Sequence, residues 1–329
     1  MFATVSDYFS AVTDHIGKAW NRFWFLPTDP LTLSVIRVLA GVIAFYTVLT
    51  FTADLTTLFG PQGLLGLENI SRMQEPAYFS FSYFWLFDDP AQLQIAHWIG
   101  LTVLGMFTLG LFTRVTSVLS LIVTLAYFHR GFPLISEMEH VLAFVMFYLC
   151  LGPSGEYFSL DRLLHKRRSP PPSTVGVTLA KKQPVGHWSA TVALRLIQVH
   201  LTIVYFMMVV AQLREDTWWD GTAVWWLAGR QDSSMIDISF LHSVPYLINL
   251  WTLGFVVFEI CFGALAWNKL LAPLMVVLSV FAWVSVGLIT GMLPFAAIMI
   301  VAGLAFLTPS SMRTMLETIG LKQQSQPAV

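Results

Sequence analysis

The sequence predicts an all-α, polytopic integral membrane protein: a bundle of about eight transmembrane helices preceded by an amphipathic interfacial helix. The chain of 329 residues is 56% hydrophobic and only 11% charged, which is not the composition of a water-soluble domain. Segments of about 20 mostly apolar residues, the length that crosses the hydrocarbon core, recur along nearly the whole chain. The expected spans are 31–53, 92–113, 115–130, 138–153, 190–213, 244–267, 269–289 and 291–308.

Residues 1–30 are expected to form an amphipathic helix on the cytoplasmic face of the membrane. Apolar residues recur there at steps of three and four, instead of forming the continuous apolar core of a signal peptide. They are Phe2, Val5, Phe9, Val12, Ile16, Trp20 and Phe23. A helix of this pattern lies in the membrane interface, and the sequence PTDP at 27–30 ends it before the first span.

The distribution of Lys and Arg predicts that both termini are cytoplasmic, because cytoplasmic loops carry the positive excess. If the chain has eight spans, the following basic residues lie on the same side of the membrane as the termini: Lys18, Arg22, Arg114, Arg162, Lys166, Arg167, Arg168, Lys181, Lys182, Lys269, Arg313 and Lys322. The other side takes only Arg72, Arg130, Arg214 and Arg230. The expected protein is therefore a multi-pass protein of the cell membrane.

The expected organisation is one bundle domain at 31–312, which includes a flexible basic cytoplasmic loop at 162–189, followed by a cytoplasmic tail at 313–329. The basic loop either contacts anionic lipid or is a topogenic charge cluster without a ligand. Cys150 and Cys261 fall inside spans, and the chain has no zinc spacing, phosphate-binding loop or dinucleotide fingerprint. Neither a metal nor a nucleic acid is therefore an expected partner.

Three charged side chains lie within the expected spans at similar depth: Arg37, Arg195 and Glu259. They are roughly 8 to 12 Å from the cytoplasmic ends of their helices, at 1.5 Å per residue. An unpaired charge at this depth costs at least about 2.5 to 3.5 kcal/mol. Glu259 is therefore expected to pair with Arg195 or Arg37, and the cluster is either an architectural clamp or a polar pocket for an anionic headgroup or substrate.

A set of groups able to move protons is expected at the external mouth, where the third and fourth spans are joined by FHRGFPLISEMEHV. In this stretch His140 or Glu139 is a candidate general base, and Arg130 is a candidate to steady an anion. The alternative is that these polar residues only keep a surface loop soluble.

A second candidate site follows the fifth span, in the tryptophan-rich loop at 214–237. The fifth span carries one polar stripe, because at 100° per residue Arg195, Gln198, Thr202, Tyr205 and Gln212 fall within an arc of roughly 100°. Tyr205 and Gln212, together with Trp218 and Trp219 of the loop, are candidates to bind a flat, lipid-soluble ring. The alternative for the tryptophans is interfacial anchoring of a helix end.

The order of these motifs resembles the vitamin K-dependent gamma-glutamyl carboxylases and their bacterial relatives, the horizontally transferred transmembrane domain (HTTM) proteins. The resemblance covers most of the chain, from FWFLPTDPLTLSVIRVLAGVIAFY and DLTTLFGPQGLLG, through HVLAFVMFYLCLGPSGEYFSLDRLL, to LRLIQVHLTIVYFMMVVAQLREDTWWDGTAVWW, GFVVFEICFG and GMLPFAAIMIVAGLAFL. It implies an all-α membrane bundle whose reaction chemistry, where present, uses a reduced quinone at the non-cytoplasmic mouth.

The departures from this family concern the catalytic residues. The carboxylases use a Lys just ahead of the fourth span as their base, and the window AYFHRGFPLISEMEH has none. Arg130 is the nearest cationic residue, but a guanidinium cannot serve as a base near neutral pH. His140 matches a family His near the start of that span, whereas Gln212-Leu213 replaces the usual Lys-Leu. Gamma-carboxylation of proteins is therefore not expected.

Two classes of function stay open. The first is a quinol-linked enzyme with its site at the external mouth. The second is a non-catalytic accessory factor that binds a lipid, a quinone, or an exported peptide or protein. The missing Lys favours the second class.

Overall fold

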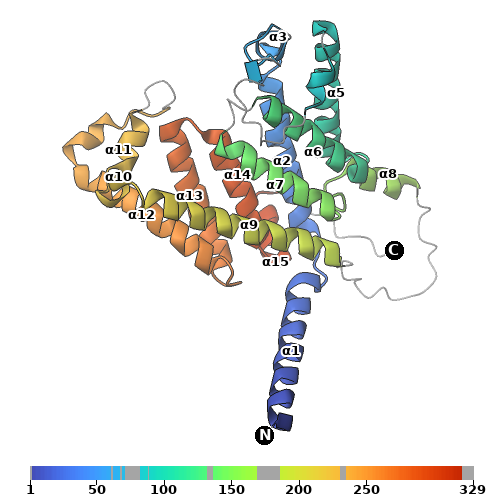
Figure 1. Ribbon diagram of the computed structural model, residues 1–329, viewed down its shortest axis with the longest axis vertical. Coiled ribbons are helices and arrows are strands. Elements are labelled where there is room, and N and C mark those ends of the chain that lie inside the picture. The colour runs from blue at the N-terminus through green and yellow to red at the C-terminus, as the bar shows by residue number, and fades with distance from the viewer. Residues whose placement is uncertain are drawn as a thin grey trace.

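The computed structural model describes residues 2–60, 62–66, 69–70, 82–87, 89–131, 136–168, 186–229 and 235–320, and over these ranges the chain is built from helices (Figure 1). The all-α architecture predicted from the sequence is therefore confirmed for this part of the chain. An isolated antiparallel bridge joins Thr28 and His187. Residues 169–185 of the predicted basic loop and 321–329 of the predicted tail lie outside the described residues.

Five helices are long and apolar enough to cross a membrane, which indicates a membrane-embedded protein. They are α2 (Leu31–Thr50), α5 (Pro90–Leu109), α9 (Trp188–Gln212), α12 (Pro245–Leu265) and α13 (Ala272–Thr290). Three further helices lie over the other expected spans: α6 (Thr113–Arg130), α7 (Glu137–Leu151), and α14 (Leu293–Gly303), which η4 (Leu304–Phe306) continues.

Shorter elements connect and flank these helices. They are α3 (Leu55–Phe59), η1 (Tyr83–Leu86), α8 (Leu160–Arg168), α10 (Asp216–Trp219), α11 (Ala223–Ala228), η3 (Ser239–Ser243) and α15 (Pro309–Thr318). The expected N-terminal helix is present as α1 (Phe2–Phe25), which extends away from the bundle (Figure 1). Its apolar side chains Phe9, Ile16 and Trp20 are exposed, and its place on the membrane surface stays a prediction.

The ends of several helices follow from local sequence. The carboxylate of Asp89 accepts a hydrogen bond from the Ala91 amide and caps α5, whose first residue is Pro90. At the other end of α5, Gly110 adopts φ +70°, a left-handed conformation that glycine tolerates best. A β-carbon there would also collide with the Arg37 side chain.

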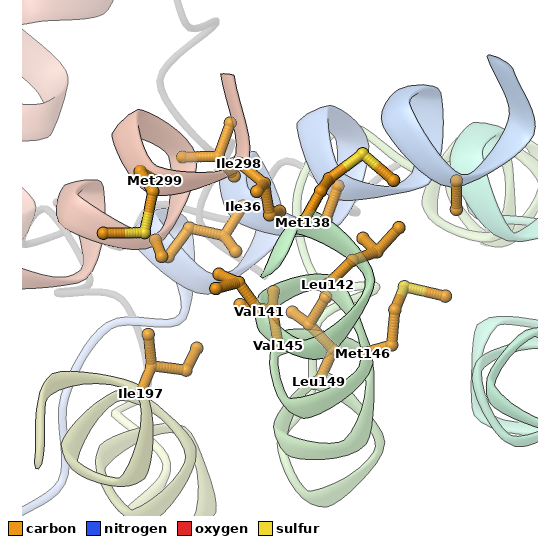
Figure 2. Close-up of a cluster of buried hydrophobic side chains, with 14 of the residues drawn as sticks. Ile36, Met138, Val141, Leu142, Val145, Met146, Leu149, Ile197, Ile298 and Met299 are labelled. Carbon is orange, nitrogen blue, oxygen red and sulfur yellow. The ribbon is translucent and has the colours of Figure 1, made fainter. Parts of the chain in front are cut away.

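The core lies where α7 meets α2, α9 and α14, and Figure 2 shows side chains from all four helices meeting there. Val141, Val145 and Leu149 of α7 are buried against Ile36 of α2 and Met299 of α14. Elsewhere α5 packs between α2 and α6, and α12 packs between α9 and α13. One candidate site lies where α5 packs between α2 and α6, and the other lies where α12 packs between α9 and α13.

Candidate functional site

The three predicted catalytic side chains at the external mouth are in different environments. Glu139 forms a capping box with Ser136 at the start of α7: its Oε2 accepts from the Ser136 amide at 2.8 Å and from the Ser136 hydroxyl at 2.6 Å. His140 is exposed and its Nδ1 lies 3.0 Å from the Ser136 carbonyl oxygen. Arg130, by contrast, is buried with 3% exposure. No hydrogen bond joins these three side chains within the described part of the chain.

A buried histidine–tyrosine pair lies next to Arg130. Nδ1 of His97, on α5, lies 2.6 Å from the hydroxyl of Tyr127 on α6. Nε2 of His97 lies 2.9 Å from the hydroxyl of Thr52, just beyond the end of α2. Both rings are only 1% exposed. One nitrogen of a neutral imidazole donates and the other accepts, so His97 links the two hydroxyl groups.

Aromatic rings surround this pair. The ring of Phe51 stacks on Tyr127 at 5.8 Å between centroids, and the rings of Phe59 and Phe84 meet Tyr127 edge-on at 5.9 and 4.8 Å. Arg130 follows Tyr127 by three residues, which places it on the same face of α6. We call the following set of residues the outer site: His97, Tyr127, Thr52 and Arg130, with the rings of Phe51, Phe59 and Phe84.

Arg130 of the outer site, and Tyr83 beside the Phe84 ring, carry hydrogen-bonding capacity that the described residues do not use. Arg130 donates from Nη2 to the Phe59 carbonyl oxygen at 3.2 Å, whereas its buried Nε and Nη1 meet no acceptor among the described residues. The buried hydroxyl of Tyr83 meets no hydrogen-bond partner in this part of the chain either. Burial raises the pKa of Tyr83 above its ordinary value, so this phenol stays neutral and able to donate near pH 7.

Sequence reasoning missed His97, Tyr127, Thr52 and Tyr83. The available signal was a histidine within an otherwise apolar span, in QIAHWIGL, because intramembrane ionisable residues are rare and face the bundle interior. The sequence does not show which helix carries the hydrogen-bond partner of His97.

The second candidate site brings together three of the four predicted binding residues. Tyr205 and Gln212 of α9 both interact with the carboxyl group of Glu259 on α12. The ring of Trp218 lies 6.4 Å from that of Phe255, one helical turn from Glu259. These residues form the inner site. Trp219, by contrast, is 65% exposed, and its Nε1 donates to the Leu213 carbonyl oxygen at 2.8 Å.

Trp283 of α13 belongs to the inner site and was not predicted. Its Nε1 donates to the Tyr205 hydroxyl at 2.8 Å, and its ring packs edge-on against Phe255 at 5.4 Å. The predicted polar stripe on α9 therefore faces protein, as an intramembrane stripe must: Tyr205 meets α13, whereas Gln198 donates to the Ala305 carbonyl oxygen of η4.

The predicted ion pair between Glu259 and Arg195 or Arg37 is wrong. Arg195 donates to the Phe23 carbonyl oxygen at 3.2 Å and to Oε1 of Gln198 at 2.8 Å, and it lies over the Phe23 ring. Arg37 donates to the Phe158 carbonyl oxygen at 2.5 Å. Similar depth therefore did not make the three residues neighbours, since each guanidinium group instead donates to a backbone carbonyl oxygen on another part of the chain.

Glu259 is fully buried, and neither of its oxygens makes a hydrogen bond of normal geometry with the part of the chain that the structure describes. Oε1 of Gln212 is likewise a buried acceptor without a partner. A carboxylate so placed costs far more than a neutral carboxyl group, and a neutral carboxyl group can donate to an amide oxygen. We infer that Glu259 is protonated and that its natural partner is Gln212.

Among the described residues, no group of three or more His, Cys, Asp and Glu side chains could hold a metal ion. The fold and the two sites thus define a helical membrane protein with two buried polar centres, each lined by aromatic rings. Comparison of the chain with protein-family models, with curated protein sequences and with solved structures finds no match. The resemblance to the carboxylases therefore stays a prediction.

Proposed function

We propose that the chain is a carboxylase-like membrane protein that carries out proton chemistry on a lipid-soluble quinol at its external mouth. The observation that carries this proposal is the buried pair of His97 and Tyr127, 2.6 Å apart, next to Arg130. Imidazole is the side chain best suited to accept a proton near neutral pH. In this proposal His97 takes the role that the sequence suggested for His140 or Glu139.

The residues of the outer site fit a reduced quinone. Among the described residues, two nitrogens of Arg130, Nε and Nη1, meet no acceptor and could donate to an anionic oxygen, and the Tyr83 hydroxyl likewise has no partner there. Phe51 stacks on Tyr127 and Phe59 stacks on Phe84, so the outer site has the apolar, aromatic surroundings that suit a flat ring. A reduced quinone, when bound, would supply the proton that this site removes and two electrons for dissolved dioxygen, the oxidant that quinol consumption requires.

The protein's own part in the reaction is to hold and move a proton. Both nitrogens of His97 are engaged by hydroxyl groups. A proton therefore reaches the imidazole through the hydroxyl of Tyr127 or of Thr52. Arg130, which cannot be deprotonated near neutral pH, stabilises the negative charge that proton removal leaves behind.

A second candidate function is non-catalytic binding, and the inner site favours it. Tyr205 and Gln212 meet Glu259 there, and Trp218 packs against Phe255 one helical turn away. A neutral carboxyl group donates to a carbonyl oxygen, and an amide both donates and accepts. The ligand in this case is a quinone or lipid, or a segment of an exported peptide or protein, and the chain acts as an accessory factor.

The test of the proposed function is quinol consumption by the purified protein in reconstituted membranes, with and without bicarbonate. Turnover above that of empty membranes is the expected result. Mass spectrometry of the gently purified protein is expected to find a copurified quinone. If no quinol is consumed and Trp218→Ala reduces ligand copurification while the exposed Trp219→Ala does not, the binding function replaces the enzyme.

The proposal includes eight spans with both termini in the cytoplasm, with α6, α7, and α14 with η4 as the three spans beyond the five long helices. In a chain whose Cys150 and Cys261 are replaced by alanine, we expect an impermeant thiol reagent to label Glu215→Cys from outside the cell. Glu317→Cys should react only after the membrane is permeabilised. The reverse pattern would refute the orientation.

A further inference from the structure

A polar cavity of about 680 Å³ lies at the end of α6 opposite the outer site. The N-terminus of α6, the C-terminus of α7 and the connection at 152–156 form its walls, together with Asp161 of α8 and Ser189 of α9. Its size is in the range of small-molecule sites. Neither the outer site nor the inner site shares a residue with it.

The charged side chains that line this cavity are one cation, Arg114, and two anions, Glu156 and Asp161. Arg114 and Glu156 are both exposed at its surface. Asp161 also lines it, but its carboxylate accepts from the amides of Phe112 and Thr113 and from the Thr113 hydroxyl at 2.8 to 2.9 Å. Asp161 also interacts with the charge of Arg37. Among the described residues that line the cavity, Arg114 and Glu156 therefore remain as one cation and one anion, which suits a ligand with both charges.

Hydroxyl groups extend the polar wall. Thr113, Ser117 and Ser154 line the cavity and are 6%, 4% and 2% exposed. Arg114 lies in the first turn of α6, where a helix end favours an anion over a cation. The Asp161 carboxylate already occupies the helix terminus and accepts from the Thr113 hydroxyl, and the Ser117 hydroxyl donates to the Arg114 carbonyl oxygen. An anionic oxygen bound here is therefore held by the Arg114 guanidinium.

One side of the cavity is apolar and exposed. Phe112, Val115 and Leu151 line the cavity, yet they are 64%, 60% and 44% exposed. The same surface continues along α6 and α7, where Val118, Leu119 and Phe147 are 47%, 42% and 49% exposed. A polar cavity that opens onto a continuous apolar helix surface fits an amphiphile, because the apolar surface can contact hydrocarbon chains.

We propose that this cavity binds the headgroup of a zwitterionic phospholipid with a primary ammonium group, such as phosphatidylethanolamine. Arg114 holds the phosphate, Glu156 holds the ammonium group, and the acyl chains lie along the exposed faces of α6 and α7. The free headgroup, phosphoethanolamine, carries the same phosphate and ammonium groups as the lipid. The apolar surface beside Val115 assigns the lipid, and not the free headgroup, as the ligand.

The test is native mass spectrometry of the full chain in detergent, titrated with dioctanoyl phosphatidylethanolamine, its dihexanoyl form, dioctanoyl phosphatidylglycerol and soluble phosphoethanolamine. The wild type should bind the dioctanoyl lipid most tightly, the dihexanoyl form less tightly and phosphoethanolamine weakest. Arg114→Gln should weaken binding of phosphatidylethanolamine about tenfold, as expected for loss of a charge-assisted hydrogen bond. Glu156→Gln should do the same and abolish the preference over phosphatidylglycerol.

The matched controls are Arg22→Gln on α1 and Glu317→Gln on α15, which change the same charges at exposed positions elsewhere. They should bind phosphatidylethanolamine like the wild type. Since Arg114 and Glu156 are exposed, their variants should also melt like the wild type, which separates lost binding from lost folding. Unchanged affinity in both cavity variants, or phosphoethanolamine binding as tightly as the lipid, would overturn the inference.

Discussion

Replacing His97 by alanine is expected to reduce quinol turnover roughly 10²–10⁴-fold, the usual contribution of a general base. The imidazole is the group in the outer site that can accept a proton near neutral pH, and its contacts to Tyr127 and Thr52 hold it in place. Tyr127→Phe removes one of these contacts and should reduce turnover as well. The measurement is quinol consumption in reconstituted membranes, for each variant at equal protein content.

The chain offers a matched control for this experiment. His200 on α9 is also a partly buried histidine within a span, and its Nδ1 lies 2.9 Å from the Tyr148 hydroxyl. His200→Ala therefore removes a similar histidine–tyrosine contact outside the outer site. Both His200→Ala and the exposed His140→Ala should keep full turnover. If His97→Ala turns over quinol like these two variants, His97 is not the base.

Replacing Asp161 by asparagine is expected to lower the free energy of unfolding by about 3 kcal/mol, since hydrogen bonds to charged groups contribute about 1.5–3 kcal/mol each. Both carboxylate oxygens accept hydrogen bonds from Phe112 or Thr113 at the start of α6. The asparagine amide would place a donor against a backbone donor. The charge that faces the fully buried Arg37 would also be lost. Thermal unfolding in detergent measures the effect.

The pH dependence of this effect follows from the pKa of Asp161. Burial acts to raise this pKa, but the hydrogen bonds from Thr113 and Phe112 and the charge of Arg37 outweigh it, so the pKa is lowered. A carboxyl group with a lowered folded-state pKa stabilises the protein fully above its unfolded pKa of about 3.9. The stability difference between wild type and Asp161→Asn should thus be constant above about pH 5. It should shrink as the pH falls below about 4.

Glu259→Gln provides the contrasting case. If Glu259 is neutral and donates to Gln212, an amide of the same shape replaces it at a cost below about 1 kcal/mol. If instead it is a carboxylate paired with an arginine, the loss should reach about 3–5 kcal/mol. A melting temperature of Glu259→Gln far below that of the wild type would therefore contradict the protonated state inferred from the structure.

The sequence by itself determined the class of protein and much of its local structure. Low charge content and apolar runs predicted a helical membrane protein, because hydrocarbon requires each backbone group to be satisfied within its own segment. Helical periodicity also placed Tyr205 and Gln212 on one face of α9, and the structure has both at Glu259. These features depend on residues that are close in the sequence and lie on one helix, so they can be predicted from the sequence alone.

Only the tertiary structure decided which helices meet. His97 and Tyr127 are 30 residues apart and become partners because α5 packs on α6. Arg195, expected at Glu259, instead contacts Phe23 at the end of α1. In a membrane, side chains that face lipid are as apolar as those that face another helix. The apolar runs therefore fix the extent of each span and the polar side chains fix its inward face, whereas the partner across each interface follows from how all the helices pack together.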